Sequence, residues 1–168
     1  FVLAAVQQNG EALQYVSEGL QGDTKIVLTA LEQNIYALLW ASEELKADSK
    51  FMLAAVQQNG LALQYASPKL KDDSEIVFKA VQQNGLALQY AAAELRKDRD
   101  VVLAAVQQNG EAIGWALPEL RDDSEIVLAA VRQNEQALRH ISEKLRNDRK
   151  VVLAALEKNI YALLWASE

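Results

Sequence analysis

Hydrophobic residues recur along this chain in a pattern that repeats every 25 residues. Each unit opens on a large apolar residue and continues through a mainly apolar stretch to an invariant asparagine. The spacing never slips, so the chain divides into six complete units and the first 18 residues of a seventh. A fixed period in the range of about 20–50 residues is typical of solenoids and similar arrays. The predicted units are 1–25, 26–50, 51–75, 76–100, 101–125, 126–150 and the truncated 151–168.

Each unit is predicted to contain two short helices, and the first runs from repeat position 24 to position 8 of the next unit. An aspartate stands at position 23 in all six complete units, where it would cap the helix N-terminus. Positions 1, 2, 3, 5 and 6 are apolar and cover an arc of about 200° on a helical wheel. Such an arc is too wide for a helix with one solvated face, so we expect this helix to lie between neighbouring units.

The invariant asparagine at position 9 marks the predicted turn between the two helices. Asparagine suits this place because it tolerates left-handed backbone and can also cap the next helix. Position 10 is glycine in four units but Ile35, Glu135 and Ile160 in the others, so the turn itself does not require glycine. The second helix is predicted over positions 10–17. Pro68 and Pro118 at position 18 suit the start of a short extra turn, whose leucine at position 20 packs inward.

The composition is that of a soluble globular protein, with 51% hydrophobic and 24% charged residues and a net charge of −6. The acidic balance argues against a partner bound through its phosphate backbone, so nucleic acid is not an expected partner. Cysteine is absent, which excludes disulfides and leaves the cellular compartment undetermined. The longest apolar stretch is far shorter than a membrane span.

The polar residues form two rows along the predicted array. Positions 18–25 hold 31 of the 40 charged residues, with both signs mixed, as at Asp98, Arg99 and Asp100. This pattern favours a solvated edge over a phosphate-binding surface. The Gln-Gln-Asn tripeptides, such as 57–59, form the second row. They are interpreted as solvated helix ends or, alternatively, as a surface for an extended ligand.

Few residues suggest chemistry. His140 is the single histidine, and it occupies position 15, where the other units have tyrosine or tryptophan. We therefore interpret it as a flat ring in a column of aromatic residues that pack against neighbouring second helices, with a stacking groove as the alternative. The Asp72-Asp73 pair is interpreted as a helix cap with a solvated neighbour, because the spacing of a calcium loop is missing. No catalytic pair, metal-binding set or phosphate loop is present, so we expect neither enzyme activity nor a cofactor or metal.

Units two and seven depart from the pattern, because both contain the phrase N-I-Y-A-L-L-W-A-S-E. It places large apolar residues at positions 11, 14 and 15, and positions 11 and 14 are predicted to point outward. Exposed apolar patches mark interfaces, so these residues are the predicted partner-binding residues. The alternative is that a duplication copied a neutral variant. The predicted residues are Tyr36, Leu39, Trp40, Tyr161, Leu164 and Trp165.

The phrase V-L-x-A-V-x-x-N-G-x-A-L-x-Y-A-S resembles the tandem repeats of the domain of unknown function four-one-one-six, and the resemblance covers the whole chain. It implies a helical repeat scaffold from a family that forms long arrays, and it carries no catalytic residues to transfer. Ile35 and Ile160 depart from the glycine of that phrase.

The expected fold is therefore an all-α solenoid of about seven two-helix repeats, an excerpt of a longer array. The expected function is a non-enzymatic scaffold for protein–protein contacts, for example as an accessory or linking subunit of a larger assembly. Its partners would be other proteins or further repeats of the same parent chain. The alternative is a solenoid that recognises an extended peptide, glycan or nucleic acid along its Gln/Asn row.

Overall fold

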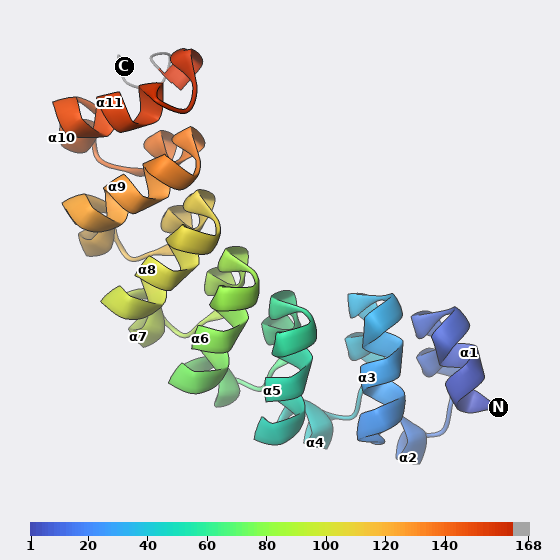
Figure 1. The fold of residues 1–168 in the computed structure, drawn as a ribbon. Coiled ribbons are helices and arrows are strands. Elements are labelled where there is room, and N and C mark those ends of the chain that lie inside the picture. Colours follow the sequence, from blue (N-terminus) through green and yellow to red (C-terminus); the bar gives the residue numbers. More distant parts are fainter. Residues whose placement is uncertain (163–168) are drawn as a thin grey trace.

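The computed structural model describes residues 1–162, and these form a curved stack of helical units that follow one another in sequence order (Figure 1). No β-strand occurs among the described residues. The all-α solenoid expected from the 25-residue period is confirmed. Each complete unit holds three helical segments, which correspond to the two predicted helices and the predicted short extra turn.

The first segment of each unit is the long α-helix predicted over positions 24 to 8. In the six complete helices that follow α1, an aspartate carboxylate accepts a hydrogen bond from the backbone N–H three residues later, as the sequence predicts. Both faces of these helices are buried between neighbours. The long helices are α1 (Val2–Gln8), α3 (Thr24–Gln33), α5 (Ser49–Gln58), α6 (Ser74–Gln83), α8 (Arg99–Gln108), α9 (Ser124–Gln133) and α11 (Arg149–Leu156).

The second segment is a 3₁₀-helix that ends at position 15, and not the α-helix to position 17 that we predicted. The residue at position 16 is extended, for example at Ala66 with ψ 150°. A 3₁₀-helix has three residues per turn, so side chains three apart lie one above the other. These helices are η1 (Gly10–Tyr15), η2 (Ile35–Trp40), η3 (Gly60–Tyr65), η5 (Gly85–Tyr90), η6 (Gly110–Trp115), η8 (Glu135–His140) and η9 (Ile160–Ala162).

The third segment is one turn long and carries the leucine of position 20, which is buried or half-buried in every complete unit. Pro118 opens its segment, as predicted. The third segments are α2 (Glu18–Gln21), α4 (Glu43–Lys46), η4 (Leu70–Asp72), α7 (Ala93–Arg96), η7 (Pro118–Asp122) and α10 (Glu143–Arg146).

The backbone conformation at position 9 shows that one of our two reasons for the invariant asparagine, its tolerance of left-handed backbone, is wrong. Its backbone is extended, with φ between −148° and −157° at the first six copies, so left-handed conformation is not used. Its capping role is confirmed, since all seven side-chain oxygens accept a hydrogen bond from the backbone N–H two residues later.

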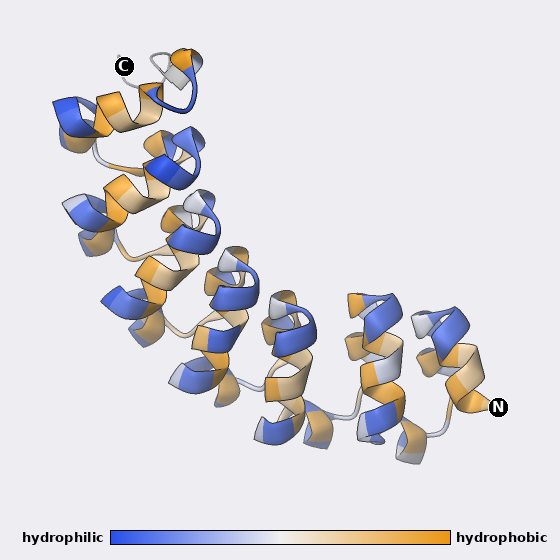
Figure 2. Cartoon of the chain, in the orientation of Figure 1, coloured by the Kyte–Doolittle hydropathy of each residue, from blue (hydrophilic) through white to orange (hydrophobic). Residues whose placement is uncertain are grey.

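Neighbouring units are also joined through their backbones. The N–H at position 17 donates to the carbonyl at position 21 of the preceding unit, as from Ala92 to Lys71 at 2.8 Å and from Leu117 to Arg96 at 3.0 Å. The same bond joins Ser42 to Gln21 and Ser67 to Lys46. These bonds lie on the outer side of the arc with the third segments, while the polar turns at position 9 lie on the inner side (Figure 2).

Candidate functional site

The strongest candidate site is an apolar patch on η2. Tyr36, Leu39 and Trp40 are 58%, 55% and 41% exposed, respectively. Tyr36 and Leu39 are three residues apart on a 3₁₀-helix and therefore lie on one side of it. We call these three residues the η2 patch. Trp40 follows Leu39 in the chain and lies about a third of a turn further around η2. The structure thus exposes all three residues that the sequence singled out in unit two.

Ile35 explains why units two and three lie further apart than units three and four. In the units that have glycine at position 10, the next unit lies directly on it: a Cβ atom at Gly60, Gly85 or Gly110 would lie 2.3 Å from the position-5 carbonyl oxygen of that unit. Ile35 has a Cβ atom, so Ala55 of the third unit cannot approach in the same way. Figure 1 shows the ribbons of α3 and α5 set further apart than those of α5 and α6. Glycine at position 10 is therefore required by the neighbouring unit and not by the turn.

The η2 patch continues into the aromatic column at position 15. Tyr65 and Tyr90 are half-buried and pack against the core, as we expected for this column. Three other rings of the same column are exposed and do not fit that expectation, namely Tyr15, Trp40 and Trp115. Burial raises the pKa of the Tyr65 phenol, and the nearby phenols of Tyr36 and Tyr90 raise it further. Tyr36 of the patch and the tyrosines of the next two units are therefore close neighbours on one face.

The second copy of the phrase lies at the end of the described chain. Ile160 and Tyr161 on η9 are 71% and 69% exposed. Leu164 and Trp165, which complete the predicted set, lie outside the described residues. Tyr161 is therefore placed on a surface, while its grouping with the other two residues stays a prediction.

The Gln/Asn row is not a set of free side chains. The side-chain oxygens of Gln83, Gln108 and Gln133 accept hydrogen bonds from the position-10 N–H of the preceding unit, at Gly60, Gly85 and Gly110. Gln83 and Gln133 also donate their amide groups to the position-8 carbonyl of that unit, both at 3.3 Å. Position 8 thus clamps one unit to the next, a role that neither of our two interpretations included.

Glycine at position 10 permits the clamp without ensuring it. Among the described residues the clamp is found after Gly60, Gly85 and Gly110 but not after Gly10, Ile35 or Glu135. Glu135 replaces glycine before the seventh unit, whose position 8 is Lys158. There the Asn159 amide donates to the Glu135 carboxylate at 3.0 Å instead. The pairing of a glycine with a glutamine 23 residues later was present in the sequence and could have indicated the contact.

A row of cations at position 21 also escaped the sequence analysis. Lys46, Lys71, Arg96, Arg121 and Arg146 are half-buried, unlike most charges on the outer edge. Lys46 donates to the Leu39 carbonyl at 3.4 Å, and Arg121 donates to the Gly114 carbonyl at 2.7 Å. Lys46 and Arg121 thus cap the C-terminal ends of their 3₁₀-helices. The buried Nε atoms of Arg96 and Arg146, by contrast, have no hydrogen-bond partner within residues 1–162. The regular spacing of this row was hidden among the many other charges of positions 18–25.

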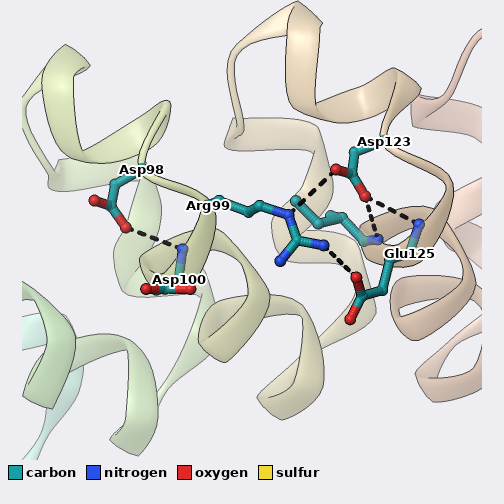
Figure 3. A network of polar contacts seen from close by, with 6 residues as sticks. Asp98, Arg99, Asp100, Asp123 and Glu125 are labelled. Atoms are coloured by element: carbon teal, nitrogen blue, oxygen red, sulfur yellow. Dashed lines mark hydrogen bonds and ion pairs between the residues drawn. The ribbon is translucent and has the colours of Figure 1, made fainter.

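The charged edge holds ion pairs between units, of which Figure 3 shows the most extensive. Arg99 at the start of α8 pairs with Asp123 and Glu125 at the start of α9. Asp123 also caps α9, and its bond from the Ile126 N–H holds the pKa of its carboxyl below the usual range, with Arg99 adding to this effect against the opposing effect of burial. Asp122, the preceding residue in the chain, is exposed, as predicted for the solvated neighbour of a capping aspartate.

Replacing Asp123 with alanine is expected to lower the free energy of unfolding by about 1 kcal/mol at neutral pH, because α9 loses its cap. The folded-state pKa is depressed, so this stabilisation is present above the unfolded pKa of about 4 and is lost as pH falls through the folded value. The difference from the unsubstituted chain should therefore narrow below about pH 4 in urea unfolding measured across pH. Asp122→Ala is the matched control, and an equal loss in both variants would contradict the assigned role.

The geometry defines the class of protein as an α-solenoid of repeats that pack in sequence order. The family described as Domain of unknown function (DUF4116) matches residues 1–46, 48–96, 73–121 and 123–168, and the chain belongs to this family. No curated protein matches the chain. No solved structure matches it either. Among residues 1–162, no helix has the length and hydropathy needed to cross a membrane, and no cluster of metal-ligating side chains is found.

Proposed function

We propose that the protein is a non-enzymatic helical scaffold that binds another protein, or further repeats of its own parent chain, through the η2 patch. The observation that carries the proposal is the exposure of three large apolar side chains, Tyr36, Leu39 and Trp40, on the single short helix η2. Large aromatic side chains supply most of the binding energy at protein interfaces. The corresponding positions of the third and fourth units carry leucine, glutamine and half-buried tyrosine, so a patch of this kind is not a general feature of the repeat.

The open junction between units two and three supports the same proposal. Ile35 keeps the third unit from approaching as closely as glycine allows, so Leu39 and Trp40 stay accessible beside it. A repeat that served only to continue the stack would gain from the glycine and the glutamine clamp found in the next junctions.

The alternative function is recognition of an extended ligand along the Gln/Asn row. It has less support, because the asparagine oxygens cap the 3₁₀-helices and the oxygens of Gln83, Gln108 and Gln133 are bonded to the preceding unit. A ligand would have to replace these bonds.

The double variant Tyr36→Leu, Leu39→Gln tests the proposal, since it gives unit two the residues of the third and fourth units. We expect an unchanged helical circular dichroism signal and at least a tenfold loss of the partner recovered with the tagged chain, measured by quantitative mass spectrometry. A photocrosslinker placed at position 39 should give a discrete product with the same partner.

Leu153→Gln is the matched control, because Leu153 is 51% exposed and lies on α11, away from η2. It should leave recovery of the partner unchanged. Equal recovery with the double variant and the unsubstituted chain would overturn the assignment of the η2 patch as an interface.

A further inference from the structure

A cavity lies between three successive 3₁₀-helices on the face that carries the aromatic column. It has a volume of about 230 Å³ and is lined by Leu86, Glu111, Gly114, Trp115, Arg139 and His140. These residues come from η5, η6 and η8, in units four to six, so the cavity is separate from the η2 patch in unit two. Its volume is below the roughly 300–1,000 Å³ of sites for drug-sized ligands, which indicates a ligand about the size of one side chain.

Gly114 creates the cavity. It stands at position 14, where the other units have glutamine, leucine or arginine. The His140 ring lies against it, since a Cβ atom at Gly114 would be 3.1 Å from the ring. The backbone does not require glycine here, because no glycine of the described chain has positive φ. The missing side chain therefore makes room for the His140 ring between η6 and η8.

The polar groups of the cavity favour an anionic ligand over a cationic one. Both carboxylate oxygens of Glu111 already have partners: one accepts from the Asn134 amide at 3.4 Å and the other pairs with Arg139 at 3.5 Å. Arg139 uses its Nε group toward His140 and one terminal nitrogen toward Glu111, so the rest of its five N–H groups remain for a ligand. Glu111 therefore already contacts Asn134 and Arg139 through both of its oxygens, and its charge neutralises part of the site.

The surroundings of His140 favour the neutral form of its ring. The groups that face it are Arg139, Glu111 and Arg121, the last of which donates to the Gly114 and Ala116 carbonyls beneath the cavity. Burial lowers the pKa of His140, and Arg139 and Arg121 lower it further, while Glu111 acts in the opposite direction. The neutral ring accepts a hydrogen bond from Arg139 at Nε2 and keeps an N–H group on the other nitrogen. An anion bound beside this ring would raise its pKa.

The cavity also has two large apolar side chains in its lining. Trp115, which is 43% exposed, and Leu86 both line the cavity. Aromatic rings stack well on tryptophan. We propose that this cavity binds a carboxylate attached to an apolar or aromatic body, with the carboxylate on Arg139 and His140 and the body on Trp115. The same chemistry is found in a free aromatic acid and in the C-terminus of a peptide that ends in an aromatic residue.

Benzoate and its uncharged counterpart benzamide are the probes that test the proposal. Because His140 is the single histidine, its ring protons give one resolved signal in NMR spectra of the full 168-residue chain. We expect benzoate to shift the His140 and Trp115 signals saturably and to raise the pKa of His140, while benzamide does neither. Equal shifts with both probes, or no saturable shift with benzoate, would overturn the proposal.

Variants locate the binding groups. Arg139→Gln should weaken benzoate binding about tenfold, which corresponds to the loss of one charge-assisted hydrogen bond. Gly114→Gln should abolish binding, because it restores the residue found at position 14 in units one, three and four. Arg132→Gln removes an exposed arginine of the same unit outside the cavity and should have no effect. Binding that survives Arg139→Gln and Gly114→Gln unchanged would show that the site lies elsewhere and would overturn the proposal.

Two further ligands distinguish the sources of the carboxylate. The peptide Ala-Ala-Phe with a free C-terminus should bind more tightly than benzoate if the natural ligand is a peptide end, and its amidated form should not bind. If the free peptide binds no more tightly than benzoate, the site is one for small aromatic acids. Tyr36→Leu, Leu39→Gln should leave all these affinities unchanged, so failure of the scaffold proposal and failure of this one are separate results.

Discussion

Replacing Gly85 with isoleucine is expected to lower the free energy of unfolding by about 3 kcal/mol, the upper part of the usual range for overpacking. The reason is the contact between units four and five, where a Cβ atom would lie 2.3 Å from the Ala105 carbonyl oxygen. This neighbour is backbone on a packed helix, so the fifth unit has to move away as a body. Urea unfolding gives the free energy, and hydrogen exchange should show faster exchange of the amide groups on either side of this junction.

Gly19→Ile is the control for this prediction, because nothing lies within 4 Å of a Cβ atom built at Gly19. It should be neutral or slightly stabilising, since glycine is a poor residue within a helix. A loss at Gly85 no greater than at Gly19 would contradict the close approach and, with it, our explanation of the open junction at Ile35.

Replacing Gln108 with leucine is expected to cost about 1–3 kcal/mol, the usual range for leaving a buried backbone N–H without a partner. Gly85 is buried between units four and five, and its N–H donates to the Gln108 side-chain oxygen. Leucine has a similar length but accepts no hydrogen bond. The loss is measured as the shift of the urea unfolding midpoint at constant slope.

Gln107→Leu is the matched control for the clamp, since Gln107 is as exposed as Gln108 and lies next to it on the same helix, while the bond to Gly85 is made by Gln108. It is expected to change stability by less than about 0.5 kcal/mol. Equal effects at Gln107 and Gln108 would mean that the polar row is only a solvated helix end, as one of our two sequence interpretations held.

Several parts of the fold followed from local patterns. The aspartate at position 23, the asparagine at position 9 and the apolar positions between them predicted the long helix with its cap and its turn. These are local effects, because each cap accepts a hydrogen bond from an N–H two or three residues away. The η2 patch was likewise predicted as a set of outward apolar residues, and Tyr36, Leu39 and Trp40 are exposed as expected.

The second helix was predicted less well. Its sequence G-L-A-L-Q-Y is compatible with either an α-helix or a 3₁₀-helix. The 3₁₀ form leaves C-terminal carbonyls that position-21 side chains bond, at Leu39 and Gly114, and these contacts come from the folded structure. The cavity at Gly114 was also not predicted, because its lining comes from three units and depends on the direction in which the His140 ring turns.

The sequence by itself determined the 25-residue period, the caps and the exposed residues of unit two, since these depend on neighbours along the chain. Only the tertiary structure decided which polar side chains form hydrogen bonds between units and at which junction neighbouring units lie further apart. Gln108 looks identical to Gln58 in the sequence, yet the clamp forms where the preceding unit has Gly85 and not where it has Ile35. The physical reason is that this side-chain bond needs the close approach seen at Gly85, which the Cβ atom of Ile35 prevents at position 10, although the backbone bond from Ser67 to Lys46 still joins the same two units.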